Sequence, residues 1–185
     1  MKVICILAGL LVLWLSYPYV RCVRKRIICY RKLRNICKAK GFRLKKTHIL
    51  WFLGGRNSKK CNCYIETPVS VFCIKLFGVA LRLRTLVFVE EREYFLQRHW
   101  GVMLWIHETL DGDSINLPEY DFKYKEEENY REKQRYHILL INPVPVEILH
   151  QFDNGKKVIL NPGDKIRGME VYNQSQLLTR LENLV

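Results

Sequence analysis

Cysteines offer the most reactive side chains of this chain, and all seven stand in its first 73 positions, at 5, 22, 29, 37, 61, 63 and 73. Cys61 and Cys63, with Cys73 nearby, provide the thiolates that zinc prefers, and His48 could add an imidazole. A structural zinc site takes four ligands, usually as two spaced pairs, and no second pair follows. An odd number of cysteines is also a poor disulfide framework. We therefore expect packed, reduced thiols, without a metal or another cofactor.

A nucleophilic role for Cys73 would require a histidine base and a third group that orients this base. The histidines, at 48, 99, 107, 137 and 150, stand in no local motif that provides such a pair. The stretch HETLDGDSIN (107–116) carries carboxylates but lacks the ligand spacing and the closing glutamate of a calcium loop. Gly54 and Gly55 are not followed by the Lys-Ser/Thr pair of a phosphate-binding loop. The residue pattern therefore predicts a domain without a catalytic centre.

An uncharged stretch, VICILAGLLVLWLSYPYV, runs from Val3 to Val20 and is long enough to cross a bilayer as a helix. Trp14, Tyr17 and Tyr19 stand where an interfacial aromatic belt would lie. A cleaved signal peptide is one alternative, although SYPYVRC has bulky side chains where a cleavage site takes small ones. A buried helix of a soluble protein is the other. We expect residues 1–20 to form an uncleaved transmembrane anchor.

Nearly all of the net charge of +13 follows this stretch, because Arg21–Lys46 holds twelve Lys or Arg and neither Asp nor Glu. Only Lys2 precedes the stretch, so the positive-inside rule places the carboxyl side in the cytoplasm. Anionic lipids attract basic segments at the membrane surface. We expect residues 21–41 to form a helix that binds this surface; a nucleic-acid-binding arm is the alternative. The residues predicted to bind the membrane surface are Arg21, Arg24, Lys25, Arg26, Arg31, Lys32 and Arg34.

The same basic segment has the apolar periodicity of a helix that packs on one side. Its apolar residues recur at spacings of three and four, which predicts a stripe facing the following domain. Gly41 is a natural end for this helix. The predicted stripe consists of Val23, Ile27, Tyr30, Leu33 and Cys37.

Residues 42–185 change to short apolar or alternating runs separated by turn residues, which is typical of strands. A polar excursion interrupts them over 111–135, and Asn173 can cap a final amphipathic helix. The order predicts a cytoplasmic α+β domain with a mainly antiparallel sheet and a C-terminal helix. Strands are expected over 47–53, 61–67, 70–78, 80–90, 94–100, 137–142, 146–150, 156–160 and 168–172.

The stretch NCYIETPVSVFCIK (62–75), within this order of helix, strands, later strand and helix, resembles the nuclease-like fold with PD-(D/E)xK active sites. In that family, an acidic residue on one strand and an E-x-K on the next hold a metal. The resemblance would place Asn62 at the acidic position and Cys73 at the glutamate position, so that Lys75 alone matches. Glu66 is a nearby but displaced carboxylate. The resemblance thus implies a nuclease-like site without its metal ligands.

Topology is what these patterns predict best. We expect a single-pass protein of the cell membrane with a non-catalytic cytoplasmic domain. Its partners would be the lipid bilayer, an anionic lipid surface and another protein. The alternative is a membrane-tethered protein that binds nucleic acid or retains a degenerate nuclease-like domain.

Overall fold

The computed structural model describes residues 2–47, 60–78, 84–98, 115–117, 119–120, 122 and 133–184. In the N-terminal helix, the described side chains are Ser16, Tyr17 and those from Val20 onward.

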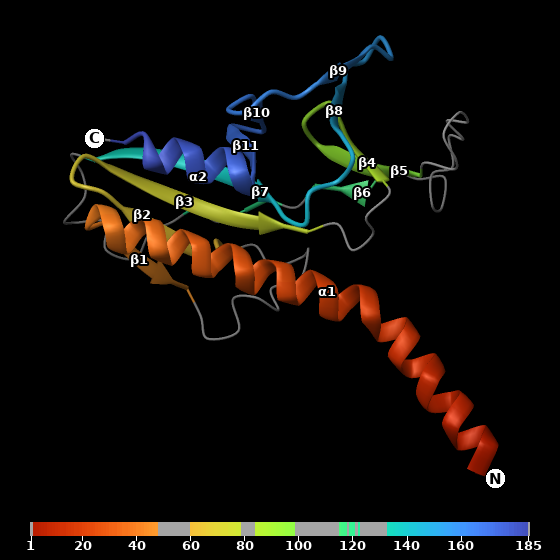
Figure 1. Cartoon of the computed structure of the whole chain (residues 1–185). Coiled ribbons are helices and arrows are strands. Elements are labelled where there is room, and N and C mark those ends of the chain that lie inside the picture. Colours follow the sequence, from red (N-terminus) through yellow and green to blue (C-terminus); the bar gives the residue numbers. More distant parts are fainter. Residues whose placement is uncertain are drawn as a thin grey trace.

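One helix, α1 (Lys2–Lys40), covers both the predicted anchor and the predicted basic helix. It ends at Gly41, whose φ of 70° and hydrogen bond to the Lys38 carbonyl confirm the predicted stop. The N-terminal half of α1 extends away from the rest of the molecule (Figure 1). Among the described residues, no helix combines the length and the hydropathy that crossing a membrane requires. Most side chains of Val3–Val20 lie outside those residues, and the anchor stays a prediction.

A mixed sheet forms the centre of the domain, in the strand order β1-β2-β3-β7-β11-β10. β1, β2 and β3 form an antiparallel meander, whereas β7 pairs in parallel with both β3 and β11. The short β10 closes the far edge as the antiparallel partner of β11. These strands are β1 (Arg43–Lys46), β2 (Cys63–Glu66), β3 (Ser70–Phe77), β7 (Gln134–Ile141), β10 (Lys165–Ile166) and β11 (Met169–Asn173).

A second mixed sheet has the order β6-β5-β4-β8-β9, with β4 and β8 in parallel. The α+β class and the C-terminal helix are confirmed, but the sheets are mixed where a mainly antiparallel sheet is predicted. Turn residues indicate neighbours along the chain, and the parallel partners are far apart in it. The strands are β4 (Arg84–Val89), β5 (Glu93–Arg98), β6 (Ile115–Asn116), β8 (Ile148–Gln151) and β9 (Lys157–Ile159).

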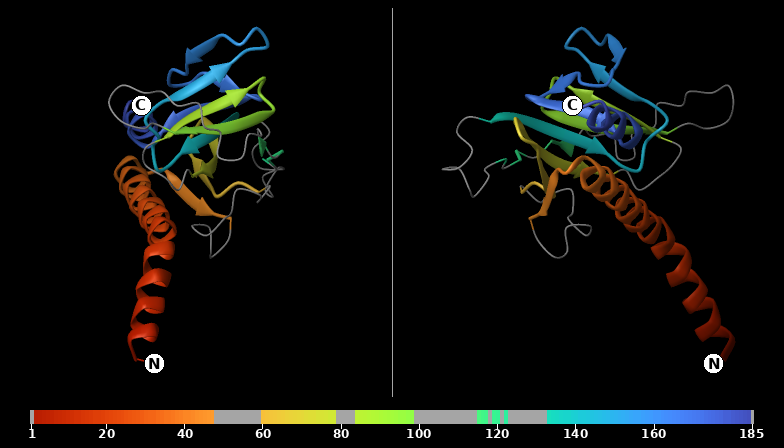
Figure 2. Two further views of the ribbon diagram at one scale, coloured as in Figure 1. Left: turned by 90° about the vertical axis from the view of Figure 1, so that its right-hand side faces the viewer. Right: turned by 60° about the vertical axis from the view of Figure 1, so that its left-hand side comes forward.

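Both described helices cover the same face of the first sheet (Figure 2). α2 (Gln174–Glu182) begins at Asn173, whose side chain accepts the Gln176 N–H in a capping box, as the sequence predicts. Leu177 and Leu181 of α2 join a core that α1, β2, β3 and β7 also build. The opposite face of the sheet packs on the second sheet, through Phe77 and Leu139 against Leu86 and Phe88 among others.

The buried face of α1 is rotated from the predicted stripe. Leu33 and Cys37 are buried as expected, but Val23 and Ile27 are only half-buried. The observed face has the helical spacing of four, three, four and four residues. It consists of Cys22, Arg26, Cys29, Leu33 and Cys37.

Candidate functional site

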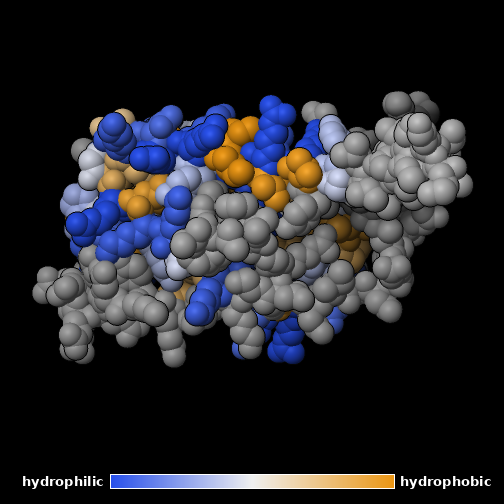
Figure 3. Space-filling model, turned by 90° about the horizontal axis from the view of Figure 1, so that it is seen from below, coloured by the Kyte–Doolittle hydropathy of each residue, from blue (hydrophilic) through white to orange (hydrophobic). Residues whose placement is uncertain are grey.

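The exposed side of α1 carries most of the residues predicted to bind a membrane surface. It lies opposite the buried face, since residues three, four and seven apart share one side of a helix. Seen from the side on which α1 lies, hydrophilic side chains gather towards its C-terminal end, and a hydrophobic patch lies nearer its N-terminal half (Figure 3). The exposed predicted residues are Arg24, Lys25, Arg31, Lys32 and Arg34.

Arg26 does not belong to that surface, and the prediction for it is wrong. Its side chain is 8% exposed and lies against Gly78, at the end of β3. A Cβ at Gly78 would stand 2.5 Å from Arg26 Nη2, so the absence of a side chain makes room for the guanidinium. Asn142 ties the end of β7 to the same turn of helix by donating to the Lys25 carbonyl at 3.2 Å. Arg21 is half-buried.

Two of the residues compared with the nuclease-like pattern, Asn62 and Glu66, hold strands together. Asn62 is 2% exposed, and its Oδ1 accepts the backbone N–H of Leu76 at 2.8 Å. Glu66 is 6% exposed and forms an ion pair with Lys45 Nζ at 3.1 Å, across the β1–β2 ladder. Burial of Asn62 and Glu66 is thus matched by polar partners within the sheet.

Lys75 is the most unusual of these residues, because it is 1% exposed in the middle of the domain. Its Nζ donates to the Lys60 carbonyl at 2.8 Å and lies 4.9 Å from the centroid of the Tyr120 ring. Burial lowers the pKa of Lys75 to about 8, while the Cys61 sulfur opposes this shift and Arg26 adds to it. Lys75 therefore has a larger neutral fraction near physiological pH than an ordinary lysine.

The structure does not bring Lys75 and Glu66 together. Glu66 stands opposite Val71, and Lys75 lies four residues further along β3, which is about 13 Å at 3.3 Å per residue. Cys73 does share the face of Lys75, where it packs with Cys61 and Tyr64. Among the described residues, no group of three His, Cys, Asp or Glu could hold a metal ion.

The thiols around Lys75 are poor nucleophiles. Burial raises the pKa of Cys73 to about 11 and also raises that of Cys61. A thiol reacts as its thiolate, and these shifts keep both sulfurs protonated at neutral pH. His137 stacks on Phe122 at 4.4 Å between ring centroids, and burial lowers the pKa of this histidine. The six described cysteines are all buried and free.

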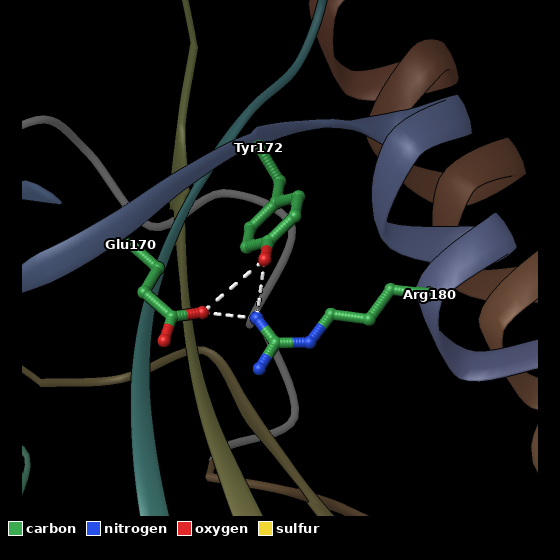
Figure 4. A network of polar contacts seen from close by, with 3 residues as sticks. All are labelled: Glu170, Tyr172 and Arg180. Carbon is green, nitrogen blue, oxygen red and sulfur yellow. Dashed lines mark hydrogen bonds and ion pairs between the residues drawn. The ribbon is translucent and has the colours of Figure 1, made fainter. Parts of the chain in front are cut away.

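Sequence reasoning missed a cluster around Arg180 of α2 (Figure 4). The guanidinium donates to both Glu170 and Tyr172, which lie two residues apart on β11. It also faces three rings, with its Cζ 4.7 Å from the centroid of Tyr136, 5.2 Å from that of Tyr172 and 5.5 Å from that of Phe72. The cluster fastens α2 to three strands through cation–π contacts and an ion pair. The amphipathic pattern of α2 shows only that Arg180 is polar.

A shallow hollow lies at the β4–β5 turn, on the second sheet. Glu90 and Glu91 form this turn with positive φ angles of 45° and 60°. A hydrogen bond between the Glu90 and Asp153 carboxyl groups raises the pKa of Glu90, and the negative charge of Asp153 adds to this shift. The hollow is lined by Glu90, Glu91, Arg92, His150, Phe152, Asp153, Asn154 and Arg167.

Two different surfaces and one interior thus remain as candidates: the basic side of α1, the hollow at the β4–β5 turn, and the buried lysine. Only the first exposes many like charges. No family model, characterised protein or solved structure matches this chain.

Proposed function

We propose that this chain is a single-pass membrane protein that holds a non-catalytic α+β domain at the cytoplasmic face of the membrane, where the domain binds a partner. The observation that carries the proposal is the continuity of α1. The same helix that contains the uncharged stretch Val3–Val20 packs its later turns into the core of the domain through Cys29, Leu33 and Cys37. An anchor joined in this way would position the domain without an intervening linker.

Side chains at the predicted membrane boundary support this arrangement. Tyr17 is 63% exposed and Val20 is 57% exposed, although both are large and apolar. Tyrosine is favoured at the membrane interface, where its ring is in contact with lipid and its hydroxyl with water. The buried face of α1 begins just after them, at Cys22.

The interior of the domain supports a role in binding over a role in catalysis. Lys75 is 1% exposed, and the neighbouring thiols of Cys61 and Cys73 are fully buried. The ring of Tyr120 lies against the Lys75 amine, with its centroid 4.9 Å from Nζ. The described surface instead presents charged side chains on α1 and a few apolar ones at Phe152, just after β8, and at Val158 and Ile159 of β9, which are features that partners bind.

The experiment is a topology assay on the full chain in membranes. A reporter that is active only in the cytoplasm, fused after Val185, should be active, and carbonate extraction should leave the protein in the membrane pellet. The basic asymmetry predicts that Gln at Arg21, Arg24 and Lys25 reduces the active fraction. A reporter signal on the opposite side of the membrane, or release of the chain by carbonate, would refute the proposal.

A further inference from the structure

The basic residues of α1 lie at very different distances from the proposed bilayer. These distances are counted from the transmembrane anchor, so the inference rests on the proposed function. With Val20 as the last residue of the span, a rise of 1.5 Å per residue puts Arg24 about 6 Å, Arg31 about 16 Å and Lys38 about 27 Å beyond it. Surface potentials are screened over about 8 Å at physiological salt. Even if α1 were tilted by about 40° from the membrane normal, these distances would shorten by only a quarter. The lipid charge therefore acts much more weakly on these later residues than on Arg24.

We define the distal basic face as Arg31, Lys32, Arg34 and Lys38, all four of which are exposed. Among the described carboxylates, none forms an ion pair with any of them. The first acidic residue of the chain is Glu66, so α1 has no acidic side chain of its own to neutralise the face. Leu33 and Cys37, on the opposite side of the same turns, are held in the core, so the helix cannot rotate to bury these charges.

The composition of the distal basic face decides which kind of anionic partner it fits. Protein partners are usually held by apolar and aromatic anchors at the centre of the interface, with charges at the rim. The exposed large hydrophobic residues of the described chain lie elsewhere, at Tyr17, Val20, Val69, Val144, Val146, Phe152, Val158 and Ile159. A phosphate backbone, by contrast, is bound by cations alone and needs no apolar anchor.

From this separation we infer that the distal basic face binds the phosphate backbone of a nucleic acid and does not read its sequence. The proximal residues Arg21, Arg24 and Lys25 stay with the lipid headgroups. Arg31 and Lys38 are seven residues apart on one ridge, about 10 Å along the axis. The face thus presents four cations along a short rod held off the membrane.

The test is a binding titration with the full-length protein in nanodiscs of neutral lipid and a fluorescent 20-base-pair duplex of mixed sequence. Four phosphate contacts give a slope of about −3.6 for log affinity against log salt. Affinity should therefore fall about 150-fold between 50 and 200 mM salt. Changing the four residues of the distal basic face to Gln should abolish this slope and weaken binding at 50 mM salt at least 100-fold. A matched control removes four exposed charges elsewhere and should bind as the unchanged protein does: Lys60, Arg135, Lys156 and Lys165 to Gln.

Three results would overturn the inference. The first is equal loss of duplex binding in the control and the distal variant, which would make the effect one of net charge. The second is displacement of the duplex by poly-glutamate of equal charge at equal concentration, which would indicate an acidic protein as the partner. The third is loss of binding to anionic vesicles by the distal variant, which would show that lipid reaches these residues. Carbonate extraction of the full chain in membranes tests the anchor separately: release of the chain refutes the proposed function, whereas absence of duplex binding by a membrane-bound chain refutes only this inference.

Discussion

Replacing Leu33 by Ala measures how firmly α1 is part of the domain. Leu33 is 2% exposed and packs in the cluster that contains Cys29, Ile65 and Phe72. Removing a buried leucine side chain costs about 2–5 kcal/mol, depending on how far the site collapses around the cavity. The cavity left by Leu33→Ala would be lined by residues of α1 and of the sheet, which cannot both move in to fill it. We therefore expect the free energy of unfolding to fall by about 3 kcal/mol. In a chain of this size, that loss corresponds to about 6–12 °C in melting temperature.

The assay is pulse proteolysis in urea on the full-length protein in a neutral detergent, which reads the folded fraction of the domain. Lys32→Ala is the matched control, because it truncates the adjacent, exposed residue and should cost under about 0.5 kcal/mol. Ile27→Ala tests the rotation of the buried face. Ile27 is half-buried, so its loss should cost less than half as much as that of Leu33.

Two results would refute the reasoning. If Leu33→Ala and Lys32→Ala have equal unfolding free energies, α1 does not pack on the domain, and the rigid connection fails with it. If Ile27→Ala costs as much as Leu33→Ala, the buried face is instead the stripe that the sequence predicts.

Further predictions concern the buried polar groups. The pKa of Lys75 is about 8 in the folded chain and near 10.5 when unfolded; the unfolded state therefore binds more protons between these values, and the lysine makes stability rise with pH there. Lys75→Met should remove this rise. The difference in urea midpoint between the unchanged protein and Lys75→Met should therefore change from pH 7.5 to 10. A difference that stays constant over this range would contradict the burial of the lysine charge. Gly78→Ala should destabilise the domain by about 1–3 kcal/mol, because its Cβ meets Arg26 and the Asn142 carbonyl; an unchanged melting temperature would count against this contact. Arg180→Lys should lower the melting temperature more than Arg167→Lys, whose partner Glu119 is exposed; the reverse order would be evidence against the Arg180 cluster. Finally, the protein should not cleave duplex DNA with Mg²⁺ or Mn²⁺, and cleavage abolished by Lys75→Ala on a gel would revive the nuclease-like alternative.

Local signals predict much of this fold because they act over a few residues. The turn at Asp153–Gly155 correctly predicts the pairing of β8 with β9, and Asn173 correctly predicts the start of α2. Pro68 likewise separates β2 from β3 as expected. Each of these rests on a backbone preference or a cap that one or two side chains determine.

Longer-range features escape such signals. The sequence does not predict β1, because Arg43–Lys46 is almost wholly basic and its strand pairing depends on β2 and Glu66. The strand predicted over 47–53 lies almost entirely outside the described residues. The polar excursion over 111–135 is described only in part and includes β6.

The candidate site was predicted in outline only. Five of the seven residues predicted to bind a membrane surface are exposed on α1. Arg26 was misplaced because its charge suggests solvent, and only the gap at Gly78 reveals where its guanidinium lies. The distances along α1 depend on the helix being continuous, which neither the uncharged stretch nor the basic one indicates alone.

The continuous helix also has a mechanical consequence. Residues 21–40 pack against the domain, so an anchor at Val3–Val20, as proposed, would make α1 a lever about 30 Å long that pivots at the membrane surface. Spanning helices adjust their tilt to the thickness of the bilayer. A change of about 10° in tilt would swing the far end of this lever by about 5 Å. A protein built in this way would convert the thickness of its membrane into the height and orientation of its domain.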